Sequence, residues 1–180
     1  MNQSMKLLAR HNFAAICTLA QFLESRGYWT TKRDIAADVA ETIHSLFDSL
    51  AWADRSLHYR ECWLLEAVLE EDQAYGAHLE KTIAEGQAAN PFPGCLAAAA
   101  LHDSVHGSEL AELLLNHLEN LGRLIIMADA EVTPIELETY KKHFAHLRST
   151  IAVSGLTHTQ GEQQDPRFGR TVTNSAGDRA

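Results

Sequence analysis

A short pattern occurs twice in this chain and constrains its fold more than any other feature. Residues 48–61 and 123–136 each contain an apolar helix end, the dipeptide Ala-Asp, a short turn and a Glu that opens the next helix. The two copies align without gaps at an offset of 75 residues, which is the spacing between Asp54 and Asp129. Two such helix–turn–helix units can each bury an apolar face against the other. The repeat therefore predicts a pseudo-symmetric helical bundle.

The apolar positions of the two copies also correspond. Before the turn, three apolar residues of the first copy align with three of the second: Ile43, Leu46 and Leu50 with Leu118, Leu121 and Ile125. After the turn, the aligned residues are Leu57, Leu65 and Leu69 with Val132, Tyr140 and Phe144. Two positions break the match, because Phe47 aligns with Gly122 and Val68 with His143. We expect the matched positions to face the core.

The rest of the chain also favours helices. Only 4 of the 180 residues are proline, and Ala, Leu and Glu are frequent, as is typical of all-α proteins. We expect an all-α bundle of about seven helices that forms one domain over residues 1–151. Its repeat units are predicted at about 32–72 and 108–148. Residues 152–180, rich in Gly, Thr, Gln, Ser and Asp, are predicted to form a flexible tail.

Several residues mark where these helices begin and end. Gly27 and Gly107 are suited to the left-handed conformation that closes a helix. The segment 90–94 contains two prolines and a glycine and is predicted to be a loop. Ser108 is expected to cap the long helix that follows it. The last strong helix is expected to end near Ile151.

Composition and charge limit the classes of partner. The formal net charge of -9 argues against nucleic acid, which needs a clustered basic face, and leaves room for a cationic ligand or a basic partner. The start of the chain shows no signal-peptide pattern, and polar residues interrupt the apolar stretch 110–128, so we expect no membrane span. The 3 cysteines are scattered, which suits a reducing compartment. These features predict a cytoplasmic protein.

The two glutamates of the repeat have a structural interpretation. Thr133, Pro134 and Glu136 form a capping-box sequence, in which the Glu side chain returns a hydrogen bond to the backbone N–H of the Thr. His58 and Glu61 occupy the same frame with a poorer cap. We therefore expect both glutamates to stabilise helix N-termini.

The two aspartates have no such simple explanation. Asp54 and Asp129 lie where a helix ends, and a negative charge there opposes the helix dipole. An Asp can accept N–H groups of a following turn, or it can bind a cation together with the Glu seven residues on. Two carboxylates with backbone carbonyls and water would suit Ca²⁺ or Mg²⁺. The second turn is the better candidate, because Arg55 brings a positive charge into the first.

The segments Leu50–Glu61 and Ile125–Glu136 resemble the turns of the TerB-like (tellurite-resistance TerB) family. The resemblance covers roughly residues 32–148 and implies an all-helical domain of two such units. It also implies that Asp54, Glu61, Asp129 and Glu136 are metal ligands in a membrane-associated stress-response system. The chain departs from the family after each Asp, where the family usually has Gly and this sequence has Arg55 and Ala130.

Aromatic and histidine residues offer further candidates. Trp52 and Trp63 flank the first turn and could form an interface, although core filling is the more common role of tryptophan. His102 and His106 lie four residues apart on a predicted helix, as metal-binding pairs do. No Glu follows His102, so this is not the zinc-protease motif. His143 and His146 are expected to flank the core and face solvent.

Three functions follow from these patterns. The first is a non-enzymatic interaction module in a stress-response or membrane-proximal assembly, which binds a protein partner and could sense a divalent cation. Such a module requires no cofactor, and any association with a membrane would be peripheral and through a partner. The second is a structural adaptor without metal. The third, least favoured, is a metal-dependent enzyme that uses the histidine pair. The oligomeric state is not predicted.

Overall fold

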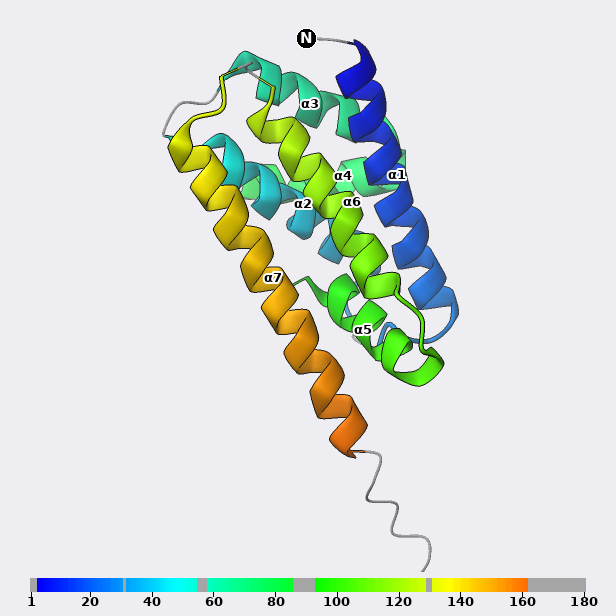
Figure 1. Cartoon of the computed structure of the whole chain (residues 1–180). Coiled ribbons are helices and arrows are strands. Elements are labelled where there is room, and N and C mark those ends of the chain that lie inside the picture. The colour runs from blue at the N-terminus through cyan, green and yellow to red at the C-terminus, as the bar shows by residue number, and fades with distance from the viewer. Residues whose placement is uncertain (1–2, 31, 55–57, 86–92, 129–130, 162–180) are drawn as a thin grey trace, which may run out of the picture.

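The computed structural model describes residues 3–30, 32–54, 58–85, 93–128 and 131–161, and within these ranges all regular secondary structure is helical (Figure 1). The expectation of an all-α bundle is confirmed. Seven helices lie in the described part of the chain: α1 (Gln3–Ser25), α2 (Ile35–Ala51), α3 (Tyr59–Leu69), α4 (Gln73–Glu85), α5 (Gly94–His106), α6 (Leu110–Ile126) and α7 (Pro134–Gly161).

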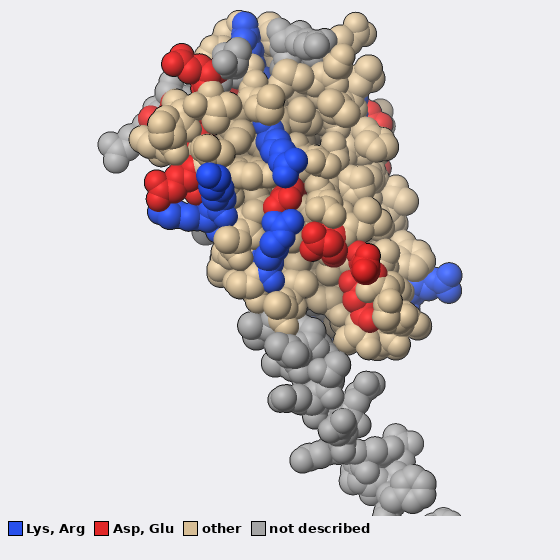
Figure 2. Space-filling model, viewed as in Figure 1, with Lys and Arg blue, Asp and Glu red and all other residues tan. Residues whose placement is uncertain are grey.

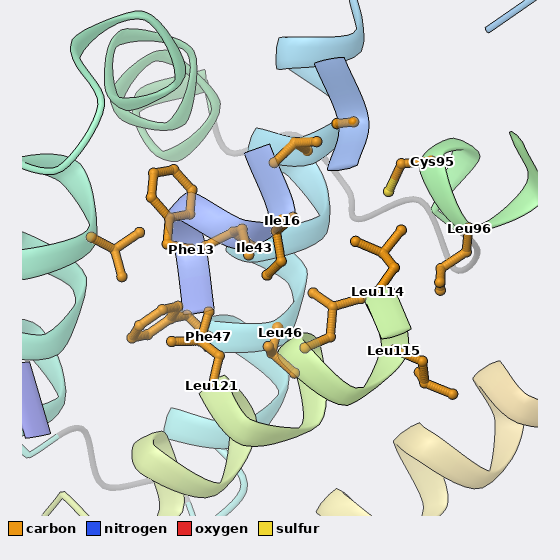
Figure 3. Packing of buried hydrophobic residues seen from close by; sticks show 14 of the residues in the cluster. Phe13, Ile16, Ile43, Leu46, Phe47, Cys95, Leu96, Leu114, Leu115 and Leu121 are labelled. Carbon is orange, nitrogen blue, oxygen red and sulfur yellow. The ribbon is translucent and has the colours of Figure 1, made fainter. Parts of the chain in front are cut away.

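The core lies where α1, α2, α5 and α6 meet. Helix α1 runs beside α6, and α2 packs mainly against α4, while α5 contacts both α6 and α7 (Figure 1). Figure 3 shows apolar side chains of α1, α2, α5 and α6 pointing into one cluster. Removing these side chains from water is the main force that holds the bundle together. The fully buried residues shown there include Phe13, Ile16, Ile43, Leu96, Leu114 and Leu121.

The repeat is visible in the two helices that precede the turns. The three matched apolar residues of α2 and the three of α6 are all at most 1% exposed. The two turns also have the same backbone, because Trp52 (φ -99°, ψ 6°) and its counterpart Met127 (φ -99°, ψ 0°) close their helices with nearly identical dihedral angles. The next residue in each turn donates its N–H to the equivalent carbonyl, Leu50 or Ile125.

The helices that follow the turns pack differently. Helix α3 packs against α1 and α4, whereas α7 packs against α5, α6 and α2. Two arginines of the second unit help to hold α7 on α6. Arg148 pairs with Glu119, and Arg123 Nε donates to the Tyr140 hydroxyl at 2.9 Å. The pseudo-symmetry is therefore close up to the turn and is lost beyond it.

A mismatched position of the repeat explains part of this difference. A Cβ atom placed on Gly122 would lie 2.9 Å from the Phe144 ring and 3.2 Å from Leu50. Gly122 therefore makes room for the ring of α7. In the first copy the sizes are reversed, with Phe47 on the preceding helix and Leu69 on the following one. Each unit thus combines a larger and a smaller side chain at these two positions, in opposite order.

Two aspartates each lie in one helix and cap the start of another. The carboxylate of Asp38, in α2, accepts the N–H groups of Gly94 and Cys95 at the start of α5, at 3.2 and 2.9 Å. Because Asp38 is only 3% exposed, these bonds also satisfy a buried carboxylate. They fix the start of α5 to the side of α2.

The start of α6 corrects the expectation that Ser108 is its cap. The Asp103 carboxylate, in α5, accepts the N–H groups of Leu110 and Ala111, both at 2.8 Å. Ser108 instead donates its hydroxyl to Asp103 at 2.6 Å. The left-handed Gly107 (φ 63°) reverses the chain and brings the carboxylate over the new helix end, and a carboxylate interacts with a helix N-terminus more favourably than a neutral hydroxyl does.

The last helix is longer than predicted. Helix α7 continues to Gly161, whereas the sequence analysis placed its end near Ile151 and the tail from residue 152. A single glycine at position 155 is tolerated within a helix, and the next proline comes only at position 166. The rest of the predicted tail, residues 162–180, lies outside the described residues.

Candidate functional site

Both glutamates of the repeat cap the helix that follows their turn, as predicted. Glu61 Oε2 accepts the backbone N–H of His58 at 2.7 Å, and Glu136 Oε2 accepts that of Thr133 at 2.6 Å. In return, the Thr133 hydroxyl oxygen accepts the backbone N–H of Glu136 at 3.2 Å. The two glutamates are 2% and 3% exposed. Their conversion to alanine would leave a partly buried N–H without its acceptor.

The poorer first cap also forms. His58 Nδ1 accepts the N–H of Arg60 at 3.3 Å, so the imidazole replaces the threonine hydroxyl of the second copy. In both caps the Glu accepts the N–H of the residue three positions before it. The second acceptor differs: it is the His58 imidazole nitrogen in the first cap and the Thr133 hydroxyl oxygen in the second. This local bonding accounts for Glu61 and Glu136 without a metal ion.

Of the two turn aspartates, which the sequence predicts as cation ligands, the structure describes only Asp54. Asp54 is partly exposed in the first turn. Asp129, the predicted centre of a cation site, lies outside the described residues. Among the residues that the structure does describe, no group of three or more His, Cys, Asp or Glu side chains is arranged to hold a metal ion.

The tryptophans near the first turn do not fill the core. Trp52 is 51% exposed and Trp63 is 39% exposed, so the core-filling interpretation is wrong for both. Trp52 lines a pocket between α2, α3 and α4, which we call the Trp52 pocket; it is lined by His44, Phe47, Asp48, Ala51, Trp52, Glu61, Cys62, Leu65 and Ile83. Its walls are mainly apolar, and the exposed residue Asp48 is one of those that line it.

The second tryptophan belongs to an aromatic group on the other side of α3. The Trp63 ring meets the Tyr59 ring edge to face at 5.0 Å, and the Lys6 ammonium of α1 lies 5.7 Å from the Trp63 ring centre. Tyr59 is 53% exposed. Large aromatic side chains that remain on the surface are typical of protein interfaces. The sequence placed two aromatics at this turn, but it gave no signal for Cys62 or Ile83 in the pocket.

Both histidines of the α5 pair contact hydroxyl groups. His102 Nδ1 lies 2.8 Å from the Ser108 hydroxyl, and His106 Nε2 lies 2.5 Å from the Tyr28 hydroxyl. The two imidazole centres are 4.5 Å apart and the rings are inclined by 43°. Each histidine therefore has one ring nitrogen bound to a hydroxyl, and the pair joins α5 to the end of α1 and to the α5–α6 turn.

The other titratable candidates are mostly structural. Burial raises the pKa of the Cys17 and Cys95 thiols, which makes both of them poor nucleophiles. Cys62 is half-buried and lines the Trp52 pocket. Burial, followed by the charge of His146, lowers the pKa of His143. His146 faces solvent as expected, but His143 is half-buried beside Phe144.

Charge on the α6–α7 face is mixed. Figure 2 shows basic and acidic side chains that lie side by side there. Arg148 lies near both Glu119 and Glu112, and Lys142 Nζ is 2.7 Å from Glu138. This pairing leaves the face without the uniform basic stripe of a nucleic-acid site. None of the described helices is both long enough and apolar enough to cross a membrane.

No protein-family model, curated protein or solved structure matches this chain. The TerB-like resemblance therefore stays a hypothesis that depends on the residues of the two turns.

Proposed function

We propose that the protein is a non-enzymatic interaction module that holds a partner segment at the Trp52 pocket. The observation that carries this proposal is the exposure of Trp52, 51%, at the wall of an apolar pocket. The equivalent turn residue of the second copy, Met127, is similarly exposed at 55%. Exposure at this position thus follows from the turn, whereas the tryptophan and the pocket belong to the first copy.

The size of the pocket favours a side chain over a free metabolite. Its volume is about 180 Å³, below the range of about 300–1,000 Å³ that small-molecule sites have. A single large apolar side chain of a partner would fill it. Aromatic and aliphatic anchors in such pockets supply much of the energy of protein interfaces.

Charge indicates the rest of the partner segment. The exposed residue Asp48 lines the pocket, and the chain as a whole carries a net charge of -9. A partner segment with an apolar anchor next to Lys or Arg would match both features. The TerB-like resemblance would place such a module in a stress-response or membrane-proximal assembly in the cytoplasm.

The interaction module expected from the sequence could also sense a cation through Asp54, Glu61, Asp129 and Glu136, whereas its alternative is a structural adaptor without metal. Cation sensing has less support, because both glutamates already accept backbone N–H groups and are buried. The enzyme hypothesis has less support still, because the α5 histidines each bind a hydroxyl through one ring nitrogen.

Selection from a random peptide library on the immobilised full-length chain tests the proposal. We expect selected peptides to contain a large apolar residue next to a basic one and to lose at least about tenfold in affinity with Trp52→Ala. Leu113→Ala is the matched control, since Leu113 is an exposed apolar residue of α6 (44%). Bound peptide should also protect the Cys62 thiol from alkylation. Peptides that bind Trp52→Ala as tightly as the unmodified chain would contradict the proposal.

A further inference from the structure

A second groove, between α1 and α6, lies away from both turns. It is lined by Leu8, His11, Asn12, His117, Asn120, Arg123 and Leu124. The imidazole centres of His11 and His117 are 6.3 Å apart, and the rings meet at 69°. Two histidines from different helices thus face one another across a surface groove, an arrangement that no sequence spacing reveals.

Hydrogen bonds fix which nitrogen of His117 is available. Asn12 Nδ2 donates to the Leu8 carbonyl at 2.7 Å, so the Asn12 oxygen is directed to the other side. That oxygen lies 3.0 Å from His117 Nδ1, which must therefore carry the proton. The lone pair of the neutral ring is then on Nε2. Asn12 is only 5% exposed, so the amide holds the imidazole firmly.

This bonding is the pattern found around metal-bound histidines. A histidine ligand usually donates its second ring N–H to a protein acceptor, which fixes both the tautomer and the ring orientation.

We infer that the groove between α1 and α6 binds a divalent transition-metal ion, such as Zn²⁺, through His11 and His117. Imidazole nitrogen is a preferred ligand of Zn²⁺, Cu²⁺ and Ni²⁺. A tetrahedral ion with Zn–N bonds of about 2.0 Å holds two imidazole centres about 5 Å apart. The observed 6.3 Å requires the exposed His11 ring to move by about 1 Å on binding. Water or a partner side chain completes the coordination.

Arg123 also lines the groove, and its guanidinium contacts groups outside it. Arg123 Nε donates to the Tyr140 hydroxyl at 2.9 Å, and its Nη2 lies 3.8 Å from Glu119. The guanidinium is therefore turned toward α7 and is partly neutralised by a carboxylate. The site is separate from the acidic turns, so this inference does not depend on the proposed function.

Calorimetric titration of the tag-free, full-length chain with ZnCl₂ at pH 7.5 tests the inference. We expect one equivalent of Zn²⁺ to bind, and His11→Gln and His117→Gln each to weaken binding at least about tenfold. His11 is exposed, so its variant keeps the test valid if His117→Gln does not fold. His106→Gln, at an exposed histidine of α5, is the matched control and should bind as the unmodified chain does.

Side-chain NMR of ¹⁵N-labelled histidine gives a second measurement. Zn²⁺ should shift the His117 Nε2 resonance and leave Nδ1 protonated, whereas Ca²⁺ and Mg²⁺ should shift neither. No heat with Zn²⁺ would overturn the inference. So would binding that is unchanged in His11→Gln, or that is lost in His106→Gln.

Discussion

The two turns of this protein have nearly the same backbone conformation but different surroundings. Both close their first helix with the same dihedral angles, at Trp52 and Met127, and both open the next helix with a glutamate cap. The difference begins after the cap, where α3 crosses to α1 and α7 lies along α5 and α6. A short local pattern thus fixes the geometry of a turn, while packing beyond the turn decides the direction of the next helix.

The comparison also separates structure from candidate function. The features that both copies share, the caps and the turn, are explained by local hydrogen bonding. Trp52, which the second copy replaces with Met127, lines the pocket at which we propose that a partner is bound. The two copies of the repeat therefore share a turn geometry and differ in the side chain that the turn exposes.

The largest loss of stability is expected at Gly122 and Phe144, where the side-chain sizes are the reverse of those in the first copy. Gly122→Ala should destabilise the protein by about 1–3 kcal/mol, because the new methyl group meets the Phe144 ring at 2.9 Å in a packed core. Phe144→Leu, which restores the size found in the first copy, should recover part of this loss in the double variant. Urea unfolding of the four proteins in this cycle measures the coupling. Strictly additive changes in the free energy of unfolding would show that the side chains at positions 122 and 144 do not interact.

The capping glutamates come next. Glu61→Ala and Glu136→Ala should each cost about 1–2 kcal/mol, because each removes the acceptor of a partly buried N–H at a helix start. The glutamine variants should lose less, since an amide oxygen still accepts the bond. Chemical unfolding of the four single variants provides the measurement, and equal losses for Ala and Gln would mean that the cap contributes little.

Trp52→Ala and Met127→Ala should affect stability least among the turn variants. Both side chains are more than half exposed, at 51% and 55%, and surface changes of this kind usually stay within about 0.5 kcal/mol. Only Trp52→Ala should weaken binding of the selected peptides. If Met127→Ala weakened it equally, the two turns would be functionally equivalent and the contrast between them would fail.

A pH dependence should distinguish the second copy from the first. His143 aligns with the fully buried Val68, and burial lowers the pKa of His143 in the folded protein. The unfolded chain therefore binds a proton more readily, so stability is full above the ordinary histidine pKa of about 6.5 and falls as the pH drops below it. His143→Val should flatten this part of the stability profile, measured by thermal unfolding between pH 7 and 5. An unchanged slope would assign the effect to another group.

Much of the fold was predictable because it depends on local pattern. Apolar spacing placed the helices, glycines at positions 27 and 107 marked two ends, and the capping frame predicted the bonds of Glu61 and Glu136. The prediction of Ser108 failed because the turn at Gly107 brings the Asp103 carboxylate to the start of α6 instead. The cap that Asp38 provides to α5 depends on a contact between residues far apart in the sequence. The same limit applies to α4, whose packing on α2 no spacing indicates.

The candidate sites were predictable only in part. Position next to a turn identified Trp52 and Trp63. The exposure of Trp63 depends on the path of α3, which differs from that of α7. The facing of His11 and His117 joins residues far apart in sequence. Burial and pairing across helices depend on the assembled bundle and not on the order of residues.

Calcium titration monitored by thermal unfolding tests the central claim, that the repeated glutamates are helix caps, most directly. The account predicts that millimolar Ca²⁺ or Mg²⁺ leaves the melting temperature of the full-length chain unchanged relative to EDTA, while Glu61→Ala and Glu136→Ala both lower it. A rise in melting temperature with Ca²⁺ that disappears in Glu136→Gln and in Asp129→Ala would contradict it. That result would show that the second turn is a cation site.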